Sequence, residues 1–192
     1  MPRPATDKRE RLTAAALDLA YRDGFDRASI TDIATAAGVA PGSVYYYFKT
    51  KQDVGLAIAG ALGERYGAAM ADWETLEDPR DRLVAFIDSY RTQASMVMEH
   101  GCPLGSVCTE LSKESPELGA AGAQVFETLV DWIASQFGEL GYSAAASHAR
   151  SVHLVSVMQG AAALSHALQS TEPLSLEGDH LERWVRNSGT TA

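Results

Sequence analysis

Residues 30–51 have the sequence ITDIATAAGVAPGSVYYYFKTK, which carries the strongest local structural signals of the N-terminal region. Ser29 is a favourable helix N-cap, and Asp32 three residues later completes a carboxylate form of the capping box. Gly38 suits the left-handed conformation that commonly follows a helix end. Pro41 is then favoured in the first turn of a second helix. The pattern therefore predicts two short helices joined by a tight turn.

Two short helices joined in this way form a helix-turn-helix, whose second helix enters the major groove of DNA. A longer helix expected over residues 7–23 and ended by Gly24 completes a three-helix unit. Small and apolar side chains are expected to fill the space between the helices, namely Ile33, Ala34, Ala37, Val39, Val44 and Phe48.

Three consecutive tyrosines, Tyr45, Tyr46 and Tyr47, lie on the second short helix. Successive residues on a helix point in different directions, so the three rings cannot all face one core. We expect Tyr47 to pack inward with Phe48, and Tyr45 and Tyr46 to face DNA, where their hydroxyls can reach phosphates. The alternative is a plain three-helix unit in which the tyrosines serve only packing.

The residues around this helix resemble the DNA-binding domain of the TetR family of transcriptional regulators. The resemblance covers about residues 8–54 without a gap, and the matching residues are Thr31, Ile33, Ala34, Ala37, Gly38, Val39, Gly42, Ser43, Tyr45, Tyr46, Tyr47, Phe48 and Lys51. It implies phosphate contacts from Thr31, Ser43, Tyr46 and Lys51, and it gives Tyr45 a role that is partly structural and partly a phosphate contact. It also implies that the residues nearest the base edges are Pro41, Gly42, Ser43 and Tyr46, and that an N-terminal arm contains Arg3, Lys8 and Arg9.

Pro41 departs from the family pattern, in which lysine or another polar residue is frequent at this position. Few side chains in this helix can therefore hydrogen-bond a base through two atoms at once. Gly42 lets the backbone approach DNA closely, and Ser43 lies at a helix N-terminus, which favours a phosphate. We expect the affinity to depend mainly on phosphate contacts and DNA shape.

The charge of the chain differs between two regions. The 192 residues carry a net charge of −9, which by itself argues against a nucleic-acid partner. Residues 1–53, however, hold eight basic and seven acidic side chains, so the acidity lies in residues 54–192. A local basic face suffices for DNA binding on an acidic protein. We expect a DNA-binding domain over 1–53, and the resemblance implies that 54–192 bind an effector and form a homodimer.

The second domain reads as helices throughout, because alternating strand patterns are absent. The predicted fold class is therefore all-α, with an irregular segment at 99–105 and helices over 51–76, 79–98, 104–113, 116–140, 144–169 and 177–187. Small residues in the 144–169 helix permit close packing with 124–137 of a second copy, as a four-helix bundle across a two-fold axis. The alternative is that both helices are intramolecular core. A two-fold dimer predicts a palindromic operator.

The effector pocket is expected to be largely apolar with a few polar groups, suited to an apolar or aromatic small molecule. Its candidate residues, for each of which ordinary core packing is the competing explanation, are Phe86, Tyr90, Met98, Cys102, Phe126, Trp132, His153 and Met158.

A Gly-Cys-x-x-Gly-x-x-x-x-Glu pattern runs from Gly101 to Glu110 and resembles a subset of the family with uncharacterised or small-aromatic effectors. Cys102 lies near the start of a helix, where a thiol can react with oxidants or electrophiles. The alternative is a buried cysteine that serves as a small hydrophobe. The spacing of Cys102 and Cys108 fits neither a redox pair nor a metal site, so we expect no metal and no cofactor.

Several function classes are disfavoured by what the sequence lacks. It has no apolar stretch of membrane-spanning length and no apolar signal core, so a cytoplasmic protein is expected. No phosphate-binding glycine loop, GxSxG or HExxH motif points to an enzyme. The acidic body argues against an architectural DNA-binding protein. The sequence predicts a transcriptional regulator, either a repressor that an effector releases by shifting the 51–76 helix or an activator on the same fold.

Overall fold

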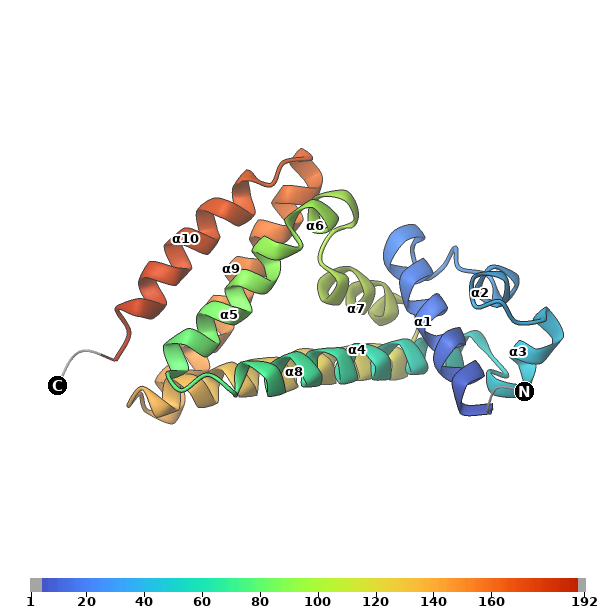
Figure 1. Cartoon of the computed structure of the whole chain (residues 1–192), viewed down its shortest axis with the longest axis horizontal. Coiled ribbons are helices and arrows are strands. Elements are labelled where there is room, and N and C mark those ends of the chain that lie inside the picture. The colour runs from blue at the N-terminus through green and yellow to red at the C-terminus, as the bar shows by residue number, and fades with distance from the viewer. Residues whose placement is uncertain (1–4, 190–192) are drawn as a thin grey trace. The chain divides into compact units, whose positions relative to one another are not determined.

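The structure is a computed structural model that describes residues 5–189, with side chains from Lys8 onward. No strand occurs in this range, which confirms the all-α prediction (Figure 1). Its helices are α1 (Ala5–Asp23), α2 (Ile30–Ala36), α3 (Pro41–Tyr47), α4 (Lys51–Trp73), α5 (Pro79–Thr92), α6 (Ala94–His100), α7 (Pro103–Glu114), α8 (Pro116–Glu139), α9 (Ala144–Leu168) and α10 (Glu172–Arg186). Among the described residues, no helix has both the length and the apolarity needed to cross a membrane.

The helix-turn-helix forms through the local signals that predicted it. The Ser29 hydroxyl accepts a hydrogen bond from the Asp32 backbone amide at 3.1 Å, and the Asp32 carboxylate accepts one from the Ser29 amide at 3.4 Å. Gly38 adopts a φ of +62°, and the next amide, of Val39, donates to the Ala34 carbonyl at 2.9 Å. The capping box and the glycine turn therefore fix where α2 begins and ends.

The expected helix over 79–98 is wrong, because the structure breaks it at Gln93 (φ −101°, ψ 13°) into α5 and α6. The Gln93 side-chain amide donates to the Ser89 carbonyl at 3.0 Å, and its backbone amide donates to the Tyr90 carbonyl at 3.2 Å. The side chain thus takes the acceptor that an uninterrupted helix would give to the backbone.

Two other predicted boundaries shift toward more helix. The segment expected to be irregular over 99–105 shrinks to Gly101 and Cys102, and Gly101 has a φ of +83°. The last helix begins at Glu172 rather than at 177, because Pro173 lies in its first turn, where a proline is tolerated.

The helices group into two compact units. The first unit contains the residues up to 65 together with 106–125, and the second contains 66–105 together with the residues from 126. Helices α4, α7 and α8 therefore contribute residues to both units.

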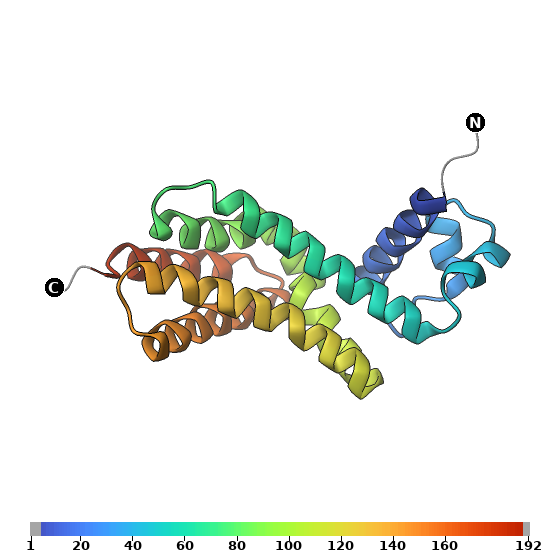
Figure 2. The same ribbon diagram turned by 90° about the horizontal axis from the view of Figure 1, so that it is seen from below.

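In the first unit, α1, α2 and α3 gather around the start of α4 (Figure 2). Phe25 and Phe48 are its largest buried side chains, each 1% exposed. The rest of its core comes from α1 to α4, α7 and α8, and includes Leu12, Ala16, Ile33, Val44, Val54, Ile58, Leu62, Val107, Leu111 and Leu118. Segments from 106–125 thus complete the core beneath the helix-turn-helix.

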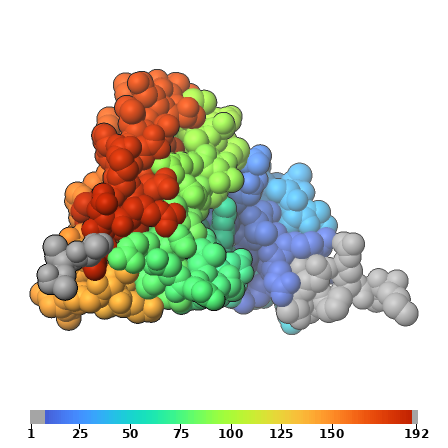
Figure 3. Space-filling model, turned by 60° about the vertical axis from the view of Figure 1, so that its left-hand side comes forward, coloured from blue at the N-terminus to red at the C-terminus, as the bar shows by residue number. Residues whose placement is uncertain are grey.

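In the second unit, α9 packs against α6 and α10, and α10 also packs against α5 (Figure 1). Helix α10 lies on the surface, where it is drawn in red in Figure 3. Arg91 of α5 ties it down through hydrogen-bonded ion pairs with Asp179 at 2.5 Å and Glu182 at 2.8 Å. The unit's core includes Leu83, Phe86, Ile87, Leu129, Ile133, Phe137, Leu154, Met158, Leu174, Leu181 and Val185.

Candidate nucleic-acid interface

Helix α3 is anchored by one side and exposes the other. Val44 and Phe48, four residues apart on one face, are 0% and 1% exposed. Tyr45 and Tyr46 leave the core, with 56% and 76% of their surface exposed, whereas Tyr47 is half-buried. The rings of Tyr46 and Tyr47 meet edge to face, with their centres 5.1 Å apart. Two adjacent tyrosines are therefore exposed on a helix whose opposite side is packed into the core.

The other residues expected near DNA on α2 and α3 also reach solvent. Thr31, Pro41 and Gly42 are exposed, and Ser43 is partly exposed. A β-carbon at Gly42 would meet no atom within 4 Å, so nothing in the protein blocks the approach of a partner to this backbone. Their contact with DNA stays a prediction.

Lys51, expected to contact a phosphate, has an internal partner that the sequence did not indicate. Its ammonium donates to the backbone carbonyl and to the carboxylate of Asp26, both at 2.8 Å, and lies 5.0 Å from the Phe25 ring centre. The hydrogen bond and the charge of Lys51 lower the pKa of the Asp26 carboxyl. The first turn of α4 is thus tied to the turn that precedes α2.

Lys49 is a basic residue of this region that the sequence interpretation missed. Its ammonium donates to the Tyr45 carbonyl at 2.7 Å and lies 5.9 Å from the Tyr46 ring centre. The signal that could have found it is its position four residues after Tyr45, about one helical turn along the chain. A basic side chain therefore lies beside the two exposed rings.

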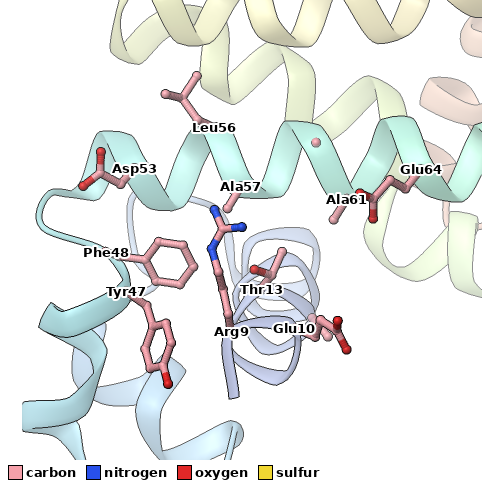
Figure 4. Close-up of a pocket in the computed structure, with 12 residues that line it drawn as sticks. Arg9, Glu10, Thr13, Tyr47, Phe48, Asp53, Leu56, Ala57, Ala61 and Glu64 are labelled. Atoms are coloured by element: carbon pink, nitrogen blue, oxygen red, sulfur yellow. The ribbon is translucent and has the colours of Figure 1, made fainter. Parts of the chain in front are cut away.

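A cavity of about 1100 Å³ opens between α1 and α4 within the first unit (Figure 4). Arg9 extends from α1 into it, with its guanidinium carbon 5.9 Å from the Phe48 ring centre. Its lining includes no residue expected to bind the effector. Of the expected N-terminal arm, Lys8 and Arg9 are described, and Arg3 lies outside the described residues.

Two of the expected effector residues meet in a buried polar cluster of the second unit. The Tyr90 hydroxyl lies 3.7 Å from the Cys102 sulfur, and the Gln159 side-chain amide donates to the hydroxyl at 2.9 Å and to the sulfur at 3.4 Å. Tyr90 is 4% and Cys102 5% exposed. Burial raises the pKa of the Tyr90 hydroxyl well above its ordinary value. The cluster therefore holds hydrogen-bonded polar groups inside an apolar core.

A row of aromatic rings extends from this cluster. The Phe86 ring centre lies 5.5 Å from that of Tyr90 and 6.0 Å from that of Trp73, which is 5.4 Å from Trp132. The Trp132 indole donates to the Glu74 carboxylate at 2.7 Å. Phe86, Tyr90 and Trp132 are thus connected through Trp73, which the sequence interpretation missed. Their contact with an effector stays a prediction.

The remaining expected effector residues differ in burial. Met158 is fully buried, and Phe126 and Met98 are partly exposed. The Met98 backbone carbonyl accepts from the Gln169 side chain at 3.0 Å. His153 is exposed, and its ring centre lies 5.2 Å from that of Trp184. Gln159, by contrast, is a member of the cluster that no local sequence pattern announced.

Two family models match the chain. The model described as "Bacterial regulatory proteins, tetR family" matches residues 12–58, which include α2, α3 and the start of α4. The model described as "Transcriptional regulator LmrA/YxaF-like, C-terminal domain" matches residues 79–180, which is more than half of the chain.

Curated relatives agree with these models. The transcriptional regulator LmrA of Bacillus subtilis is 24% identical over 171 residues, which are 88% of this chain and 91% of that protein. The transcriptional repressor NemR of Escherichia coli is 30% identical over 118 residues, which are 58% of this chain and 56% of that protein. Both the family models and the curated relatives are regulators of transcription, so the chain is not an enzyme.

Solved structures show the same fold. A TetR transcriptional regulator from Legionella pneumophila superposes with a TM-score of 0.82 at 21% identity, covering 97% of this chain and 98% of that one. The reduced form of E. coli NemR also gives a TM-score of 0.82 at 21% identity, covering 92% and 96%. With the helix-turn-helix and both family models in agreement, the chain belongs to the TetR family of transcriptional regulators.

Proposed function

We propose that this regulator is a repressor that binds a palindromic operator as a homodimer and is released by a small-molecule effector. The DNA-binding part of this proposal rests on the exposed face of α3. Tyr45 and Tyr46 are exposed beside Lys49, and Gly42 leaves the backbone open. Hydroxyl and ammonium groups on a rigid helix suit phosphate contacts in a major groove.

In this proposal the DNA contacts come from Thr31, Pro41, Gly42, Ser43, Tyr45, Tyr46 and Lys51. Lys51 acts while bound to Asp26, since its side chain keeps 40% of its surface exposed. We set the boundary of the DNA-binding domain at residue 53 along the chain, although 106–125 pack with it. The protein works in the cytoplasm, where the operator of a bacterial regulator lies.

The exposed face of α9 supports the homodimer. Outside its histidines, Arg150 is the one charged residue of this helix, and it lies over the Tyr142 ring at 4.0 Å. His148, His153 and His166 are exposed on this helix. Exposed small and uncharged residues form a stripe along it, namely Ala145, Ala149, Val152, Ser156, Gly160, Ala163, Leu164, Ala167 and Leu168. A stripe of this kind fits the same stripe of a second copy across a two-fold axis.

The buried polar cluster supports an effector site in the second unit. Tyr90, Cys102 and Gln159 offer a hydroxyl, a thiol and an amide, and Phe86 and Trp132 provide aromatic surface near them. We propose an apolar or aromatic effector with one polar group, which replaces a hydrogen bond within the cluster. Met98, Phe126, His153 and Met158 are further residues of the proposed effector domain.

The proposed release acts through α4, which contributes residues to both units. An effector that favours a shifted α4 changes the separation of the two α3 helices in the dimer. The dimer then no longer matches two major grooves one turn apart, and its affinity for DNA falls.

A gel-shift experiment with the DNA flanking the protein's own gene tests the proposal. We expect tight binding that is lost when one half of the palindrome is scrambled, and that weakens steeply between two salt concentrations. A reporter gene under that promoter distinguishes repression from activation. Binding that ignores the palindrome, or a reporter that the protein switches on, would contradict the proposed repressor.

A further inference from the structure

Glu110 of α7 makes a contact that neither DNA binding nor effector binding explains. Its carboxylate accepts a hydrogen bond at 2.5 Å from the backbone amide of Phe25, 85 residues earlier. Phe25 follows the end of α1, and its amide donates to this side chain from a distant helix. Glu110 is also the final residue of the Gly-Cys-x-x-Gly-x-x-x-x-Glu pattern.

The turn that receives Glu110 is shaped for it. Gly24 has a φ of +97°, and a β-carbon there would lie 3.4 Å from both carboxylate oxygens of Glu110. A side chain at this position would therefore be strained in its backbone, and its β-carbon would be in van der Waals contact with the carboxylate. The glycine lets Glu110 lie against the main chain of the turn.

The same turn is held from a second direction by α4. Phe25 is 1% exposed, and a β-carbon at Gly55 of α4 would lie 3.2 Å from its ring. Lys51 binds the carbonyl and the carboxylate of Asp26. Helix α7 thus binds the Phe25 amide, and α4 binds the Asp26 carbonyl and packs on the Phe25 ring. This turn ends three residues before Ser29, the N-cap of α2.

Helix α7 is itself held firmly within the first unit. A β-carbon at Gly119 would lie 3.3 Å from the Ser112 α-carbon, and one at Gly122 would lie 3.2 Å from the Cys108 β-carbon, so α8 packs closely on α7. Helix α8 is joined to α4 by the hydrogen bond from Gln52 to Glu117. The position of Glu110 is therefore fixed relative to α4, from which α3 is separated by three residues.

We propose that Glu110 is a positioning residue for DNA binding, which holds the turn at residues 24–26 so that α2 and α3 keep the orientation needed by the operator. This role rests on the proposed DNA-binding function. It also makes α7 a helix whose displacement loosens the helix-turn-helix, because the carboxylate and the Phe25 amide separate when α7 moves.

The test compares Glu110→Ala, Glu110→Gln and the control Glu114→Gln, which removes an exposed carboxylate one turn later on α7. In Glu110→Ala we expect hydrogen exchange at residues 24–29 to speed up roughly tenfold relative to α9, because a buried amide loses a charged acceptor. Affinity for the DNA fragment should fall roughly tenfold with an unchanged salt dependence, since no phosphate contact is removed. Glu110→Gln keeps an acceptor and should lie between Glu110→Ala and the wild type.

Unchanged exchange at residues 24–29 in Glu110→Ala, or DNA binding as tight as or tighter than that of the wild type, would overturn the proposal. The exchange measurement needs no DNA, so failure of the wild type to bind the fragment contradicts the proposed function and leaves the exchange result standing. If Glu110→Ala does not fold, Glu110→Asp, which is too short to reach the Phe25 amide, replaces it in both measurements.

Discussion

Tyr46 in the first unit and Tyr90 in the second have the same side chain, but one is exposed and the other is buried. Tyr46 keeps 76% of its surface exposed on α3, whereas Tyr90 keeps 4% and shares its hydroxyl with Gln159 and Cys102. A ring left in solvent on a rigid helix is free to meet a partner. A buried hydroxyl must be hydrogen-bonded and becomes part of the stability of the core. The first unit therefore has its tyrosine hydroxyl on the surface, where a partner can reach it, and the second unit has its tyrosine hydroxyl inside the core.

The largest effect on operator affinity is expected from a substitution in the second unit, at an apolar side chain that is exposed to solvent. Leu164 of α9 is 55% exposed within the proposed dimer stripe. Leu164→Arg should convert the dimer to a monomer and weaken operator binding roughly a hundredfold, because the two half-sites are no longer bound together. Analytical ultracentrifugation and a gel shift measure both effects.

The matched control for this variant is Leu76→Arg, which introduces the same charge at a residue that is 38% exposed outside the stripe. It should leave both the dimer and the affinity unchanged. A Leu164→Arg protein that stays dimeric would mean that the apolar stripe of α9 has another use.

A smaller effect is expected on the stability of the first unit, when a methyl group is added where its core is tightly packed. A β-carbon at Gly55 would lie 2.8 Å from the Leu118 side chain, whereas one at Gly60 on the same helix would meet nothing within 4 Å. Gly55→Ala should lower the free energy of unfolding by about 1–3 kcal/mol through overpacking. Gly60→Ala should raise it by about 0.4–1 kcal/mol by restricting the unfolded chain. Equal effects of the two changes in urea unfolding would contradict this packing.

The smallest effect concerns the Tyr90 hydroxyl. Tyr90→Phe should lower the free energy of unfolding by about 1 kcal/mol, because Gln159 loses an acceptor. Burial raises the pKa of this hydroxyl, so its contribution is fully present below about pH 10 and is lost as the pH rises through the folded-state pKa. Urea midpoints measured across the alkaline range should fall less steeply in Tyr90→Phe than in the wild type. Parallel curves would contradict the assignment.

The sequence predicted the first unit well because its signals are local. The capping box from Ser29 to Asp32, the turn at Gly38 and the proline at position 41 each act within a few residues, and all form as expected. Helix geometry required that Tyr45, Tyr46 and Tyr47 not all face one core, and the family resemblance implied that Tyr45 and Tyr46 contact DNA. The partner of Lys51 did not follow, because Asp26 lies 25 residues earlier and meets it only in the folded chain.

The second unit was predicted less completely because its contacts join distant residues. Tyr90 and Gln159 are 69 residues apart, and no repeat or motif links them before α5 and α9 fold together. The break at Gln93 depends on one side chain competing with the backbone for the Ser89 carbonyl. Periodicity predicts which residues face a core, but not which polar side chains pair inside it.

The most direct test is a titration of one labelled operator fragment with the wild type, Tyr46→Ala and Tyr90→Phe, followed by fluorescence anisotropy. We predict that Tyr46→Ala weakens binding roughly ten- to hundredfold, as expected for loss of a hydrogen bond to a charged phosphate, with unchanged thermal stability. Tyr90→Phe should bind DNA like the wild type and be less stable. Wild-type affinity in Tyr46→Ala would contradict the claim that the outward face of α3 contacts the operator.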